Sequence, residues 1–193
     1  MASVTPTTPQ TPTTPVTPQT PLTSSLATPA GGLLNAVVDL SHHNTVTSFA
    51  DASAAGVIGI IHKATQGTDF TDATYDENRA AAKAAGLLWG AYHFARGGDV
   101  AAQVDHFLSV ANAGPDELLV LDFEPNSKEG TMTLKEAEDF VTLVQQKTGR
   151  LPGLYSGQSF LTEVLGKNTA TVLAKCWLWI ARYASTIPAV PPA

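Results

Sequence analysis

The chain has 193 residues, of which 44% are hydrophobic, and a formal net charge of −6 at pH 7. This length accommodates one domain of ordinary size with an appendage, and the apolar share is enough for a substantial core. An acidic chain without basic clusters is attracted neither to nucleic acid nor to an anionic membrane surface, which excludes both as partners. No stretch is long and apolar enough to span a bilayer, so we expect no membrane insertion.

The N-terminal residues 1–34 are dominated by Thr and Pro and contain no charged side chain. Proline restricts φ and donates no backbone hydrogen bond, and the segment has few apolar side chains to bury. We therefore predict a disordered linker over residues 1–34 and a folded domain over residues 35–193. The segment lacks a basic region followed by a continuous apolar run, so it does not read as a signal peptide.

Strand-like and helix-like segments alternate from residue 35 onward. The predicted strands are short apolar runs at residues 35–41, 56–65, 87–94, 117–124, 151–157 and 176–183. The predicted helices are residues 45–56, 74–86, 99–114, 133–149 and 158–166. Continuous apolar strands separated by helices are typical of a parallel sheet covered by helices. No GxGxxG or GxxxxGK[ST] loop supports an open nucleotide-binding sheet, so we predict an α/β fold of the TIM-like (β/α) barrel type.

Two local signals refine these elements. Thr133 and Glu136 have the spacing of a capping box at the start of one helix, and Gly86, Gly114 and Gly149 are expected to end three of the helices. The single cysteine, Cys176, excludes an internal disulfide and lies in an apolar stretch, which indicates a buried, inert thiol.

Every predicted strand becomes polar at its C-terminal end, where (β/α) barrels carry their chemistry. The side chains at these ends are Asp39, Ser41, His42, His62, Lys63, Tyr92, His93, Asp122, Glu124, Tyr155, Ser156, Trp179, Arg182 and Tyr183. A barrel would bring them to one mouth. Trp179 and the tyrosines then offer flat faces for sugar rings, although a tryptophan in a strand also commonly fills the core.

Asp122 and Glu124 are two residues apart, so they share one face of a strand with Cα atoms roughly 6.5 Å apart, and Asp39 approaches from the first strand. Like charges in partly apolar surroundings raise at least one pKa, which supplies a general acid beside a stabilising carboxylate. Glycoside hydrolysis needs this pair, because its transition state resembles an oxocarbenium ion and its leaving oxygen takes a proton.

Other readings of the same residues stay open. The two carboxylates at a strand end are also compatible with solvated loop residues or ion-pair partners. A metal site with His42, His43 or His93 is a further alternative, but no HExxH-like spacing supports it, and we expect no metal and no cofactor. Each histidine is more often a structural hydrogen-bonding residue than a catalytic one.

The ordered motifs of residues 36–183 resemble glycoside hydrolase family 25, the N-acetylmuramidase lysozymes. These motifs are VVDLSHHN, HKATQGTDFTD, GAYHF, LVLDFE, LPGLYSG and WLWIARY. The resemblance implies an irregular barrel of five βα units followed by further strands. It also implies cleavage of the β-1,4 bond between N-acetylmuramic acid and N-acetylglucosamine in bacterial peptidoglycan, by a monomer that is secreted or delivered to the cell wall.

The resemblance also assigns roles to individual residues. Glu124 resembles the general acid/base, Asp122 the carboxylate that steadies the charged intermediate, and Asp39 the third acid of the cleft. The positions that match substrate-contacting or cleft-shaping residues are Tyr92, Lys63, His93, Tyr155, Trp179 and Arg182.

The sequence departs from the family pattern at two places. Gln66 stands where many relatives carry an acidic residue, and the final strand segment of the family is absent, so we expect a barrel that is truncated or closed differently. The remaining alternatives are a chitinase-like glycosidase, an inactive module that binds wall glycans, and an adhesion domain on a stalk.

Overall fold

The computed structural model describes residues 36–168 and 170–181, which belong to one compact unit spanning residues 33–193. The linker predicted for residues 1–34 lies outside the described residues. Arg182 and Tyr183, which we expect at the site, also lie outside the described residues.

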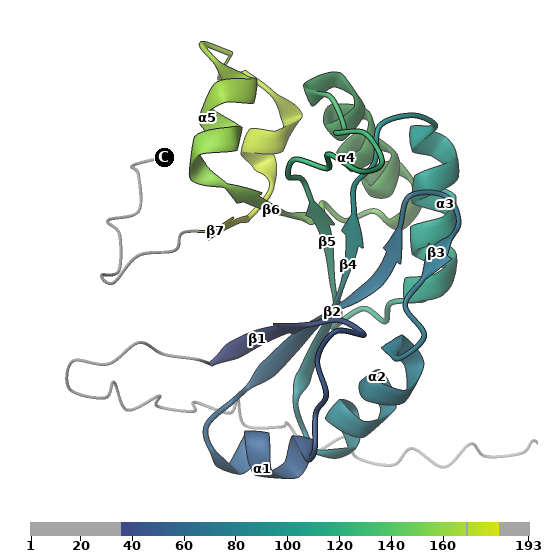
Figure 1. The fold of residues 1–193 in the computed structure, drawn as a ribbon, viewed down its shortest axis with the longest axis vertical. Coiled ribbons are helices and arrows are strands. Elements are labelled where there is room, and N and C mark those ends of the chain that lie inside the picture. The colour runs from purple at the N-terminus through teal and green to yellow at the C-terminus, as the bar shows by residue number, and fades with distance from the viewer. Residues whose placement is uncertain (1–35, 169, 182–193) are drawn as a thin grey trace, which may run out of the picture. The chain divides into compact units, whose positions relative to one another are not determined.

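A curled sheet forms the centre of this unit (Figure 1). Its strands are β1 (Val37–Leu40), β2 (Gly59–Gln66), β3 (Phe70–Thr71), β4 (Leu88–Phe94), β5 (Leu118–Asp122), β6 (Gly153–Gly157) and β7 (Leu178–Ala181). They pair in the order β1-β2-β4-β5-β6-β7, all parallel, while the short β3 runs antiparallel to the end of β2. Within the described residues β1 and β7 are the two edges, so the sheet is a half-barrel. The predicted α/β fold of TIM-like type is confirmed.

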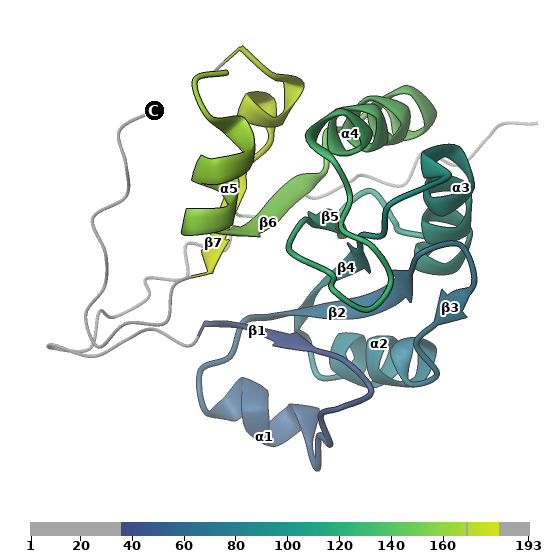
Figure 2. The same cartoon turned by 45° about the horizontal axis from the view of Figure 1, so that its top comes forward.

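The helices cover the convex side of this sheet, as Figure 2 shows for α2, α3 and α4. They are α1 (Phe49–Ala54), α2 (Tyr75–Ala84), α3 (Val100–Ala111), α4 (Leu134–Thr148), α5 (Gln158–Leu165) and the short 3₁₀ helix η1 (Val172–Lys175). Local hydrogen bonds decide where they begin and end. The capping box at Thr133 forms as predicted. Helix α3 ends before Gly114, because Asn112 adopts a left-handed conformation with φ of 38° and caps it.

The core lies between the sheet and these helices. Alternate strand residues point to the convex side, where Trp89, Leu121 and Phe123 are almost completely buried. The ring of Phe123 meets that of Phe160 on α5 edge-on, with centroids 5.0 Å apart. Because Phe123 faces this core, the residues on either side of it, Asp122 and Glu124, face the concave side.

Candidate active site

Strand register builds one row of side chains across the concave side. Asp122 on β5 pairs with Tyr155 on β6, and Tyr155 pairs with Trp179 on β7. A pocket of about 130 Å³ opens at the C-terminal ends of these strands, and its walls are formed by Asp39, Tyr92, Asp122, Glu124, Tyr155 and Trp179. The structure therefore brings the predicted acidic residues to one place, together with three of the expected substrate contacts.

The acidic side chains of the pocket differ in burial. Asp122 is only 7% exposed, and its Oδ1 has no hydrogen-bond partner among the described residues. Burial raises the pKa of Asp122 well above its ordinary value of 3.8; the charges of Glu124 and Asp39 add to this effect, and that of Lys63 opposes it. Burial also raises the pKa of the half-buried Glu124. Both carboxyl groups therefore bind their protons more tightly than the same groups do in water.

Tyr92 supplies a neutral hydroxyl to the same pocket. Burial is the main cause that raises its pKa above 10, and the neighbouring charges of Asp122 and Asp39 act in the same direction. The phenol therefore stays protonated and can donate a hydrogen bond to a bound ligand.

The aromatic rings of Tyr155 and Trp179 form another part of the pocket wall. Tyr155 and Trp179 meet edge-on with ring centroids 4.9 Å apart, and both are half-buried. Trp177 is different, because its indole covers the backbone of Gly153: a Cβ on this glycine would lie 2.2 Å from the ring. Trp177 therefore packs against β6 and does not line the pocket, so Trp179 is the tryptophan that offers an aromatic surface to a ligand, beside Tyr155.

His93 does not reach the pocket, contrary to the expectation for a substrate contact. Its imidazole is fully buried on the convex side of β4, hydrogen-bonded to Thr65 Oγ1 at 2.8 Å and Gln103 Oε1 at 3.1 Å. Burial lowers the pKa of His93 to about 4. The physical reason is strand alternation: Tyr92 and His93 are neighbours on β4, so only one of them can face the concave side.

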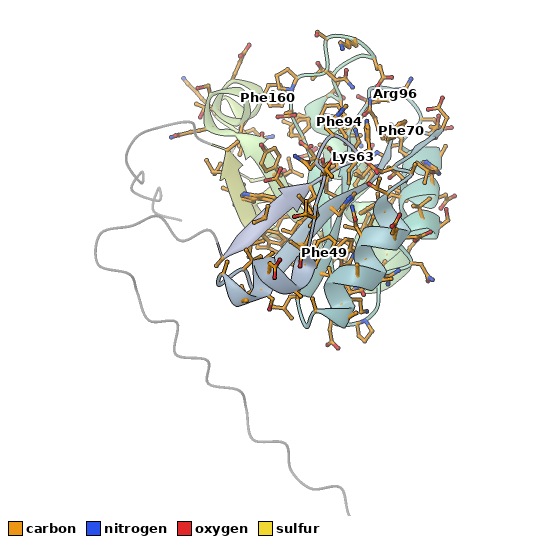
Figure 3. The ribbon with its side chains drawn as sticks, turned by 60° about the horizontal axis from the view of Figure 1, so that its bottom comes forward. Phe49, Lys63, Phe70, Phe94, Arg96 and Phe160 are labelled. Carbon is orange, nitrogen blue, oxygen red and sulfur yellow. The ribbon has the colours of Figure 1, made fainter. Side chains whose placement is uncertain are left out.

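Lys63 faces the concave side but does not line the pocket. Its side chain is 9% exposed, and its ammonium group donates a hydrogen bond to Gln66 Oε1. The Nζ atom lies 5.0 Å from the ring centroid of Phe70 and 4.9 Å from that of Phe94 (Figure 3). The expected direct substrate contact of Lys63 has no support in this arrangement.

Asp72 is a residue near the site that the sequence reasoning missed. Its carboxylate accepts hydrogen bonds from the backbone N–H and the Nδ1 of His42, at 2.9 and 2.8 Å, and from the backbone N–H and hydroxyl of Thr74. Burial alone would raise the pKa of Asp72, but these bonds outweigh burial and lower it to about 2. Asp72 thereby fixes the loop that follows β1, the strand that carries Asp39. His42 and Asp72 are thirty residues apart, so no local sequence pattern predicts that they pair.

The remaining polar groups suggest no further chemistry at the site. In the part of the chain that the structure describes, no group of three or more His, Cys, Asp or Glu side chains is placed to hold a metal ion. Over the same residues, the helices are too short or too polar to traverse a lipid bilayer. Burial raises the pKa of Cys176 to about 11, which fits an unreactive thiol.

Comparisons with known proteins agree with this geometry. The sequence profile described as "Glycosyl hydrolases family 25" matches residues 38–192. The chain is 28% identical to an N,O-diacetylmuramidase from Chalaropsis sp over 169 residues, covering 79% of this chain and 80% of the relative. It is 30% identical to lysozyme M1 from Streptomyces globisporus, covering 80% of this chain and 56% of that protein. A muramidase structure from Acremonium alcalophilum superposes with a TM-score of 0.71 at 33% identity, over 79% of each chain.

Proposed function

The chain belongs to family 25 of the glycosyl hydrolases, and from this premise we propose that it cleaves the β-1,4 bond between N-acetylmuramic acid and N-acetylglucosamine in peptidoglycan. The observation that carries the proposal is the pocket that gathers Asp39, Asp122 and Glu124 beside the ring of Trp179. Relatives named as lysozyme and N,O-diacetylmuramidase support the same substrate. With this substrate, the protein acts at the bacterial cell wall.

Glu124 is the general acid/base of the proposed reaction. It is half-buried, so burial raises the pKa of its carboxyl group while the group still reaches water. In the first step this proton goes to the glycosidic oxygen as the bond to C1 breaks. In the second step Glu124, now a carboxylate, takes a proton from the water that attacks C1, which returns the enzyme to its starting state.

Asp122 stabilises the intermediate between these steps. We infer that the acetamido oxygen of the N-acetylmuramic acid residue attacks C1 and forms an oxazolinium-like ring. Among the described residues, nothing forms a hydrogen bond with Oδ1 of the buried Asp122 carboxyl, and an N–H donated to it by the acetamido group would favour its ionised form. The resulting carboxylate offsets the positive charge of the ring. Tyr92 on β4 and Asp39 on β1, which also line the pocket, orient the sugar.

The test replaces Glu124 with glutamine, which keeps the side-chain volume and removes the transferable proton. We expect Glu124→Gln to fold normally and to lose roughly 10²- to 10⁴-fold of the rate of cleavage of purified peptidoglycan. The matched control is Glu163→Gln, because Glu163 is exposed on α5, away from the pocket. Mass spectrometry of the new reducing ends identifies the bond that is cut, and chitin is digested in parallel. Near-wild-type activity of Glu124→Gln, or preferential cleavage of chitin, would contradict the proposal.

A further inference from the structure

Lys63 is a buried lysine whose ammonium group contacts aromatic rings and an amide. It lies on β2 and pairs with Tyr92 of β4. Asp122 of β5 pairs with Phe94, which is two residues further along β4, so Lys63 and Asp122 are one side-chain row apart on the same face of the sheet. The rings of Phe70 and Phe94 and the neutral amide of Gln66 surround its ammonium group. Among the residues that the structure describes, no carboxylate forms an ion pair with Lys63. A buried charge without a partner is unfavourable, so its retention needs an explanation.

Asp122 is a buried acidic residue on the same concave side of the sheet as Lys63. Its Oδ1 has no hydrogen-bond partner within the described part of the chain. The titratable groups around it are Asp39 of β1, Lys63 of β2, Tyr92 of β4, Glu124 at the end of its own strand, and Tyr155 of β6. Two of these are acids and two are phenols, so Lys63 is the only cation in this set.

Charge compensation therefore runs between Lys63 and Asp122. Burial lowers the pKa of Lys63, and the negative charge of Asp122 is the first of the acidic groups that oppose this effect, followed by Asp72 and Glu129. The carboxylate of Asp72 already accepts hydrogen bonds from His42 and Thr74. Glu129 accepts a hydrogen bond from Gln66 and lies 3.6 Å from Arg96. Asp122 differs from both because its buried Oδ1 has no hydrogen-bond partner among the described residues.

We propose that Lys63 is a positioning residue for the reaction, whose positive charge favours the ionised form of the Asp122 carboxyl without contacting the substrate. The rings of Phe70 and Phe94 pack against the ammonium group, which does not line the pocket but lies on the same face of the sheet as Asp122, one side-chain row away. Because Gln66 is neutral, it fixes the direction of the ammonium group and leaves its charge available. The kinetic consequence rests on the proposed function of Asp122.

The kinetic test compares Lys63→Met with Lys63→Arg, which keeps the charge. We expect Lys63→Met to move the acidic limb of the pH profile of kcat/KM upward by about 1–2 pH units, because Asp122 loses a compensating charge and ionises at higher pH. Lys63→Arg leaves the limb in place, and KM for purified peptidoglycan changes little in either variant. A raised KM at every pH with no displaced limb would indicate substrate contact and overturn the proposal. Lower thermal stability in both variants with an unmoved limb would equally overturn it.

A second measurement needs no activity. In ¹³C NMR of the wild-type protein, the Lys63 Cε resonance should shift at the pH at which the Asp122 carboxyl titrates, and Lys63→Met should raise that pH. Independent titration of the two groups overturns the proposal, and the wild-type spectrum decides the matter even if Lys63→Met does not fold. If the carboxyl titrates as expected but the wild-type protein does not cleave peptidoglycan, the proposed function fails while the coupling between the two charges stands.

Discussion

Replacing Asp72 with asparagine tests whether this carboxylate stabilises the loop that follows β1, the strand that carries Asp39. The hydrogen bonds from His42 and Thr74 lower the pKa of Asp72 from 3.8 to about 2, and its side chain is fully buried. A tenfold change in proton affinity corresponds to about 1.4 kcal/mol, so the ionised carboxylate contributes about 2.5 kcal/mol to the free energy of unfolding at pH 7. We expect Asp72→Asn to lose about this amount, because its amide cannot accept all of these bonds.

The pH dependence gives the test its sign. A carboxyl group with a lowered pKa stabilises the folded state fully above pH 3.8, and this contribution disappears as the pH falls through about 2. The difference between wild type and Asp72→Asn, measured by urea unfolding, should therefore shrink to roughly half at about pH 3. Asp69→Asn is the matched control, because Asp69 lies between β2 and β3, close to Asp72 in the chain, and forms an ion pair with Arg96. The Asp69 side chain is 75% exposed, so this substitution should lower the free energy of unfolding by less than about 1 kcal/mol. A difference that is small at pH 7, or that does not change with pH, would refute the reasoning.

Two further predictions concern the pocket wall and the core. Trp179→Ala should lower kcat/KM on peptidoglycan by about tenfold, chiefly through KM, because it removes an aromatic ring from the pocket wall. Trp177→Ala, measured beside it, should lower stability instead, and equal KM effects would contradict the assignment. The free energy of unfolding of the wild type should fall as the pH drops from 6.5 toward about 4, because unfolded His93 binds a proton that the buried imidazole does not. His93→Gln should flatten this slope in denaturant titrations, and an unchanged slope would show that another group causes it.

Much of the fold was predictable because it follows from local patterns. The strand and helix segments were recognised from apolar runs and from caps, such as the capping box at Thr133, that involve residues close together in the chain. The two-residue spacing of Asp122 and Glu124 places them on one face of any strand, with Phe123 on the other. Their common pocket with Asp39 follows from the parallel order of the strands.

The sequence by itself therefore determined the alternation of elements, the family resemblance and the acidic pair, since each depends on residues near one another along the chain. Only the tertiary structure decided that Tyr92 and not His93 faces the pocket, because an apolar strand covered on one side carries no signal of which set of alternate residues points inward. It likewise paired Asp72 with His42 and enclosed Lys63 between two rings, because such contacts depend on strand register and helix packing between segments that are distant in sequence.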